Sequence, residues 1–188
     1  MSYLKERIKH AVRFRHKRGY GVHSPFMFHL ILNVIRDKEK RFSYPEGLEK
    51  KLKNREKKVF RLLVRLISHL KAQQVCCLGI YAQALADYLK QAYPIAVIQS
   101  NSPIDYEQTD FVYIGRRAID FISEEELVTL LETKKIKYVI IADIYKKSYN
   151  ARLWRLYRTQ ATVTVDMMWY GLLVFDDKVQ RGKYNLII

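Results

Sequence analysis

A glycine turn after a short apolar strand is the first place in this sequence where the residues could do chemistry. Gly79 follows the apolar run 75–78, and a helical pattern begins at about residue 83. A strand, a turn and a helix in this order present backbone N–H groups to a nucleotide-type cofactor, provided that further glycines let the ligand approach the backbone. Here the later positions carry side chains, including that of Tyr81. The turn therefore predicts a cofactor site that has been modified or lost.

Further candidates follow the next predicted strands, where open α/β sheets bind their ligands. Gln99 and Asn101 stand at the end of the second strand, and their neutral amides could bond a ribose diol without the strength of a charged group. Gly115 follows the third strand. Asp143 follows the fourth strand and is a candidate for a catalytic, substrate-binding or metal-binding role. The interpretation we favour for Asp143 is a structural acid in the loop or at the start of the next helix.

Other catalytic arrangements find no support in the sequence. Cys76 and Cys77 are the only cysteines, and because they are adjacent they should point to opposite faces of a strand as small buried residues. There is no P-loop, no nucleophile elbow and no metal-ligand cluster, so no metal site is predicted. Ser24, which precedes Pro25, is best explained as the N-cap of a helix. His23 beside it has no acid or base at the spacing of a catalytic triad.

The positive charge is concentrated in the N-terminal part of the chain. Residues 1–74 contain 20 Lys and Arg against 6 Asp and Glu, whereas residues 75–188 contain 14 against 13. This shift predicts a basic N-terminal helical region, 1–74, and a nearly neutral α/β domain, 75–188. We expect a basic surface that comprises Lys9, Arg13, Arg15, Lys17 and Arg18. It could bind nucleic acid, above all single-stranded RNA, or an acidic protein partner. A solubilising surface and an anionic membrane surface remain alternatives.

The hydrophobic pattern predicts the elements that must position these residues. Helical patterns cover the N-terminal part up to residue 15, then 26–36, and the segment after Pro45, which has an apolar stripe over 59–70. Strands are predicted over 75–79, 96–99, 110–114, 138–143, 161–166, 171–175 and 184–188, and helices over 83–92, 123–133 and 148–158. This alternation predicts a Rossmann-like, doubly wound α/β fold with a mostly parallel sheet. The short link 167–170 predicts a terminal antiparallel hairpin.

The location of the protein is predicted from two features that the sequence lacks. No run of about 18 apolar residues is present, which argues against a membrane span. The first ten residues have no apolar core of the kind found in signal peptides. A cytoplasmic protein without a transmembrane segment is therefore expected.

The sequence resembles the class I S-adenosylmethionine-dependent methyltransferases, and in particular a group of small methyltransferases found mainly in Bacteroidetes. The most specific segments are the block 18–26, with the sequence RGYGVHSPF, and the predicted closing hairpin 162–175. The segments 109–114 and 140–145 are similar to the fourth and fifth strands of that family. The resemblance covers nearly the whole chain. It implies S-adenosylmethionine as the cofactor and a helical segment ahead of the sheet domain.

The chain departs from this family where the cofactor should bind. Relatives have an acidic residue in the first strand, a glycine-rich turn, a carboxylate after the second strand and an acid after the fourth. Only about ten residues separate the second strand from Asp110, so one strand–helix unit is missing. By position, the resemblance assigns cofactor binding to Gly79, Tyr81, Gln99, Asn101 and Gly115. We therefore expect a shortened, degenerate methyltransferase-like protein that is weakly active or non-catalytic. The alternative is a non-enzymatic module that binds nucleic acid or protein through its basic N-terminal helices.

Overall fold

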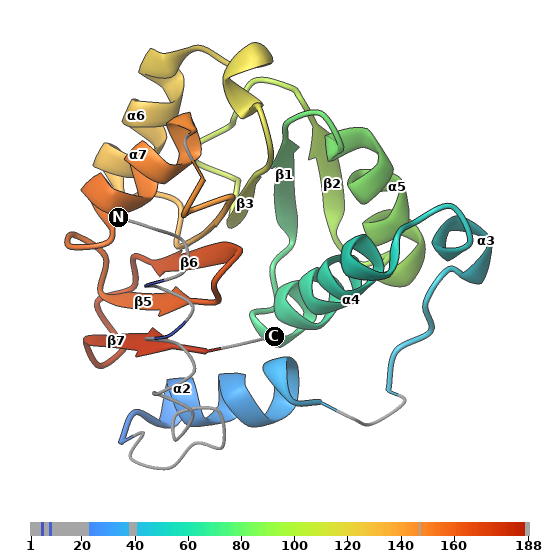
Figure 1. Cartoon of the computed structure of the whole chain (residues 1–188), viewed down its shortest axis with the longest axis horizontal. Coiled ribbons are helices and arrows are strands. Elements are labelled where there is room, and N and C mark those ends of the chain that lie inside the picture. Colours follow the sequence, from blue (N-terminus) through green and yellow to red (C-terminus); the bar gives the residue numbers. More distant parts are fainter. Residues whose placement is uncertain (1–4, 6–7, 9–22, 38–40, 147, 187–188) are drawn as a thin grey trace.

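A single mixed sheet forms the centre of the molecule (Figure 1). The structure is a computed structural model, and it describes residues 5, 8, 23–37, 41–146 and 148–186. Within these ranges seven strands pair in the order β2-β1-β3-β4-β6-β5-β7. They are β1 Gln74–Leu78, β2 Val97–Ser100, β3 Phe111–Ile114, β4 Tyr138–Ala142, β5 Val163–Asp166, β6 Tyr170–Val174 and β7 Gly182–Asn185. β6 runs antiparallel to β4 and β5, and the other pairs are parallel. The predicted Rossmann-like α/β fold with its antiparallel hairpin is confirmed.

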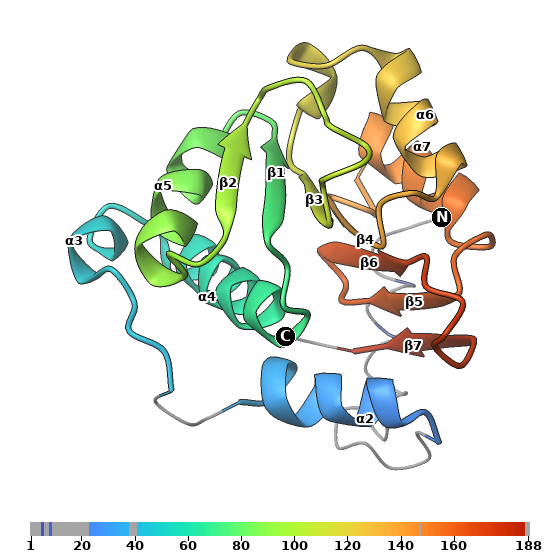
Figure 2. The same cartoon turned by 180° about the vertical axis from the view of Figure 1, so that it is seen from behind.

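Helices cover both faces of this sheet, as the two opposite views show (Figures 1 and 2). α4 Asn54–His69 and α5 Ala82–Ala92 pack on one face, whereas α6 Glu124–Thr133 and α7 Tyr149–Tyr157 pack on the other. Cys77 belongs to the first of the two hydrophobic cores and Cys76 to the second. The prediction that the adjacent cysteines point to opposite faces as buried residues is therefore confirmed.

The first described helix begins where the sequence predicts. The Ser24 hydroxyl accepts a hydrogen bond from the backbone N–H of Met27 (3.4 Å), and a proline occupies the first helical position of α2 Pro25–Leu30. The helix then widens into a π-helix, η2 Ile31–Ile35, which closes with a bond from Arg36 N–H to Ile31 O (2.9 Å). The sequence predicted one regular helix here. The buried side chains of both segments join those of α4 in one core.

The helical segment after Pro45 is divided into two helices. α3 Glu46–Glu49 is short, and α4 begins after a break at which the Glu56 carboxylate accepts a bond from Lys53 N–H (2.9 Å). The predicted apolar stripe lies on α4 and is buried against the sheet and α5: Val59, Phe60, Leu62, Leu63, Val64, Leu66 and Ile67. α4 therefore shares its core with the strands that follow it in the sequence.

A buried carboxylate joins α3, α4 and α5. Glu49 accepts hydrogen bonds from Nε and Nη2 of Arg61, both at 2.6 Å, and from the Tyr88 hydroxyl at 2.7 Å. Lys57 Nζ lies 3.8 Å from the same carboxylate. The bonds from Arg61, together with that from Tyr88 and the nearby positive charges, lower the pKa of Glu49 although burial opposes the shift. The ion pair and the Tyr88 hydrogen bond tie the end of α3 to the middle of α4 and to α5.

Candidate functional site

The turn after β1 is closed by hydrogen bonds from the protein itself. Gly79 has φ of +114°, which glycine adopts without strain. Its N–H donates to Oδ1 of Asn101 (2.8 Å), and Nδ2 of Asn101 donates to Gly79 O (3.1 Å). The next N–H, that of Ile80, donates to Arg116 O (3.1 Å). Two backbone donors that a cofactor turn would offer to its ligand are therefore already occupied.

The loops after β1 and β3 touch through their backbones. Gly115 N–H donates to Leu78 O (2.8 Å), and a Cβ placed on Gly115 would lie 2.5 Å from that same oxygen. A Cβ placed on Gly79 would lie 2.6 Å from Arg116 O. Both glycines are thus required for the packing of one loop against the other. This role explains Gly79 and Gly115 without any ligand.

The polar groups at the end of β2 also bond within the protein. Asn101 has φ of 47°, a left-handed conformation that asparagine tolerates better than most residues. The Ser100 hydroxyl donates to Gln83 Oε1 (2.6 Å), and exposed Gln99 accepts from the Ser102 hydroxyl (3.3 Å). These side chains form a local network at the position where the resemblance predicts contacts to a ribose.

Asn150 fixes the ends of β3 and β4, and sequence reasoning did not identify it. This residue of α7 is buried, and its Nδ2 donates to Gly115 O (2.8 Å) and Ala142 O (3.0 Å). A signal was present: Asn150 is the first position of a stripe that continues at Leu153, Trp154 and Tyr157. A polar residue on such a stripe is buried and must find hydrogen-bond partners.

Asp143 lies at the carboxyl end of β4 in an ion-pair cluster. Its backbone has φ of 59°, and its carboxylate is 2.8 Å from Lys146 Nζ and 3.3 Å from Arg116 Nε. The Ser148 hydroxyl, which caps α7, donates to Asp143 O (3.4 Å). The carboxylate therefore holds two cationic side chains at this edge of the sheet.

A cavity of about 460 Å³ opens between this edge and the first turns of α4 and α5. We call it the carboxyl-edge cavity. Its walls are formed by Lys51, Leu52, Lys53, Arg55, Glu56, Val59, Phe60, Tyr81, Ala84, Tyr113, Arg116, Ala142, Asp143, Lys146 and Tyr170. Of the predicted site residues, Tyr81 and Asp143 line it, whereas Gly79, Gln99, Asn101 and Gly115 do not. Burial raises the pKa values of Tyr113 and Tyr170, so both stay neutral phenols.

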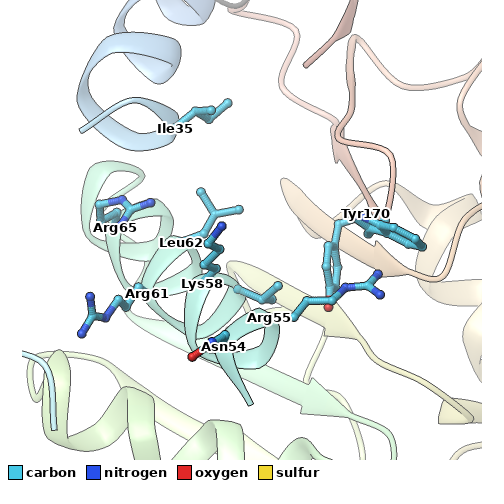
Figure 3. Close-up of a pocket in the computed structure, with 10 residues that line it drawn as sticks. Ile35, Asn54, Arg55, Lys58, Arg61, Leu62, Arg65 and Tyr170 are labelled. Carbon is cyan, nitrogen blue, oxygen red and sulfur yellow. The ribbon is translucent and has the colours of Figure 1, made fainter. Parts of the chain in front are cut away.

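A second hollow, of about 600 Å³, runs along α4 next to the first and shares Arg55, Val59 and Tyr170 with it (Figure 3). We call it the α4 groove, and it is lined by Ile35, Asn54, Arg55, Lys58, Val59, Arg61, Leu62, Arg65, Trp169 and Tyr170. The Arg55 guanidinium carbon lies 3.5 Å from the centroid of the Trp169 ring. Arg65 bonds two neutral acceptors, Val34 O (2.7 Å) and the Tyr44 hydroxyl (3.4 Å). The groove therefore combines several cations with an aromatic ring.

The basic surface predicted near the N-terminus lies outside the described residues. This applies to Lys9, Arg13, Arg15, Lys17 and Arg18. In the part of the chain that the structure does describe, no group of three or more His, Cys, Asp or Glu side chains could hold a metal ion. Over the same residues, no helix combines the length and the apolar character that crossing a membrane requires.

This edge of the sheet combines the closed turn at Gly79 with the carboxyl-edge cavity. The backbone N–H groups of the turn donate to acceptors within the protein, whereas the cavity presents cationic and aromatic side chains. Comparisons of the chain with protein-family models, with curated proteins and with solved structures found no match.

Proposed function

We propose that the protein is a class I methyltransferase-like protein that keeps the fold as a binding module and has little or no methyl-transfer activity. The mostly parallel sheet with its antiparallel hairpin, β5 and β6, supports the family, together with the resemblance over 18–26 and 162–175. The observation that carries the loss of activity is the closed turn, in which Gly79 and Ile80 donate to protein acceptors.

The energetic consequence of this closure is large for a cofactor. A charge-assisted hydrogen bond contributes about 1.5–3 kcal/mol, and each 1.4 kcal/mol changes affinity tenfold. At the end of β2 the expected carboxylate is replaced by neutral Gln99, Ser100 and Asn101. The loss of bonds at both the turn and the ribose would weaken a micromolar site to about millimolar. A protein with such a site would hold S-adenosylmethionine too weakly for efficient transfer.

We expect that S-adenosylmethionine and S-adenosylhomocysteine bind with dissociation constants of about 1 mM or weaker. Titration calorimetry and thermal-shift measurements test this, after denaturation and mass spectrometry have shown that the purified protein carries no copurified ligand. Cooperative unfolding of the ligand-free protein is the control for a correct fold. Micromolar heats with either compound would contradict the proposal and restore an active methyltransferase as the better explanation.

A second candidate function is binding of single-stranded nucleic acid, and the α4 groove is the observation that favours it. Lys58 can meet a phosphate, and Arg55, whose guanidinium lies over the Trp169 ring, adds a planar cation of the kind on which bases stack. The sequence supplies five further cations over residues 9–18. Under this candidate function, α4 would bind nucleic acid together with the basic N-terminal region.

For this candidate, we expect the double variant Arg55→Gln/Lys58→Gln to bind a single-stranded RNA several-fold more weakly. The slope of log affinity against log salt should fall by about 0.7 for each phosphate that the variant no longer neutralises. Fluorescence anisotropy at several salt concentrations measures both quantities. The matched control is Arg155→Gln/Arg158→Gln, which removes two exposed cations on the opposite side of the sheet. An equal loss in both double variants, or no RNA binding at low salt, contradicts a role for the groove.

A further inference from the structure

We propose that the carboxyl-edge cavity binds a small organic anion that carries a flat ring, such as a nucleoside monophosphate. The inference rests on the proposed function, because it names a ligand for a methyltransferase-like fold that no longer binds S-adenosylmethionine tightly. Three independent features converge on this cavity: an excess of cationic side chains, the N-terminal ends of two helices, and a floor of aromatic rings.

The charge of the cavity selects for an anion. Five cationic side chains line it, Lys51, Lys53, Arg55, Arg116 and Lys146, against the two carboxylates of Glu56 and Asp143. Both carboxylates are engaged, Glu56 by the N–H of Lys53 and Asp143 by Arg116 and Lys146. The remaining positive charge attracts a phosphate or carboxylate and repels a sulfonium. S-adenosylmethionine, with its sulfonium, ammonium and single carboxylate, is a cation overall and is therefore disfavoured here.

Two helices begin at the cavity and add to its positive potential. Lys53 and Arg55 belong to the start of α4, which has 16 residues, and Tyr81 and Ala84 to the start of α5, which has 11. The first turn of α5 contains no acidic residue, and Tyr81 at its N-cap makes no side-chain capping bond. The N-terminus of α5 therefore favours an anion through the macrodipole and its N–H groups, whereas the first turn of α4 already carries Glu56.

The floor and mouth of the cavity suit a planar ring. The ring centroids of Tyr113 and Tyr170 are 6.5 Å apart, and the buried Phe60 lines the same cavity. Tyr81 also lines the cavity and is half exposed, so its ring is open to a ligand there. A volume of about 460 Å³ falls within the range of sites that hold small ligands. A ligand with an anionic group against the cationic side chains and a planar ring against the two tyrosines would fill the cavity.

Calorimetry with adenosine monophosphate tests the proposal, with inorganic phosphate and adenosine as its two halves. We expect the nucleotide to bind more tightly than either half and to weaken as salt rises. Arg116→Gln should lower its affinity about tenfold, the effect of one charge-assisted bond. The matched control is Arg117→Gln, the adjacent exposed arginine, which pairs with Asp120 and does not line this cavity. Lys146→Gln repeats the test in case Arg116→Gln unfolds the protein.

The outcomes separate this inference from the proposed function. Absence of nucleotide binding, or an equal loss in Arg116→Gln and Arg117→Gln, overturns the anion site and leaves the closed cofactor turn untouched. Adenosine that binds as tightly as its monophosphate also overturns it, because the cationic wall would then contribute nothing. Micromolar binding of S-adenosylmethionine contradicts the proposed function, whatever the nucleotide does.

Discussion

Replacement of Glu49 with alanine is expected to lower the free energy of unfolding by about 3 kcal/mol and the melting temperature by about 6–12 °C. The substitution leaves the buried Tyr88 hydroxyl and the two Arg61 donors without their shared acceptor. Loss of one partner from a fully buried ion pair costs about 3–5 kcal/mol. The lower end applies here because the Arg61 side chain is 40% exposed and water can screen its charge. Thermal and urea denaturation measure the change.

The conservative variant Glu49→Gln separates charge from shape. It keeps an oxygen acceptor, so we expect a smaller loss than for alanine. The pH dependence gives a second check. The pKa of Glu49 is lowered below its usual value of 4.5 by Arg61 and its other partners, so the stabilisation is complete above that value. The advantage of the wild type over Glu49→Gln should therefore shrink as the pH falls through the lowered pKa. An advantage that is independent of pH would contradict the ion-pair explanation.

Replacement of Gly171 with alanine is expected to lower the free energy of unfolding by about 2–3 kcal/mol. Gly171 lies in β6, and a Cβ placed on it would come within 2.8 Å of three ring carbons of Trp154. Trp154 projects from α7, is 1% exposed and belongs to the hydrophobic core, so its rigid ring cannot yield as the end of a flexible side chain would. The added methyl group must therefore displace either the helix or the strand. Chemical denaturation measures the loss.

A matched glycine and a double variant serve as controls for this result. Gly47 in α3 has nothing within 4 Å of its added Cβ, so Gly47→Ala should be neutral or stabilising by up to about 1 kcal/mol. Trp154→Phe should cost less stability in the Gly171→Ala background than in the wild type, since the smaller ring relieves the overlap. Additive losses in the double variant would show that Gly171 and Trp154 do not compete for the same space.

The sequence predicted the fold well because local patterns decide most of its elements. The apolar run of β4 and the Ser24-Pro25 start of α2 depend on neighbouring residues alone. The π-helix at Ile31–Ile35 and the division between α3 and α4 were not predicted. Glu49 ends α3 so that its carboxylate can meet Arg61 and Tyr88, and the sequence separation between these partners hides the contact from any local pattern.

The sequence predicted which residues lie at the carboxyl edge of the sheet, but it did not predict the hydrogen bonds and ion pairs that these residues form. The sequence located Gly79, Asn101 and Gly115 at one edge of the sheet, because parallel strands place their carboxyl ends together. It could not show that Asn101 closes the turn or that Arg116 and Lys146 meet at one carboxylate. The walls of the cavity come from α4, α5, β3, β4, β6 and the loops next to them, which only the folded chain brings together.

The position of β6 has a consequence for the order in which the sheet can be completed during synthesis. β6 lies between β4 and β5 but follows both in the sequence, so β4 has no partner on that side until residue 174 has left the ribosome. Until then the apolar β4 presents an open edge, and such edges favour association with other chains. The newly made chain therefore depends on the β5–β6 hairpin to cover this open edge of β4.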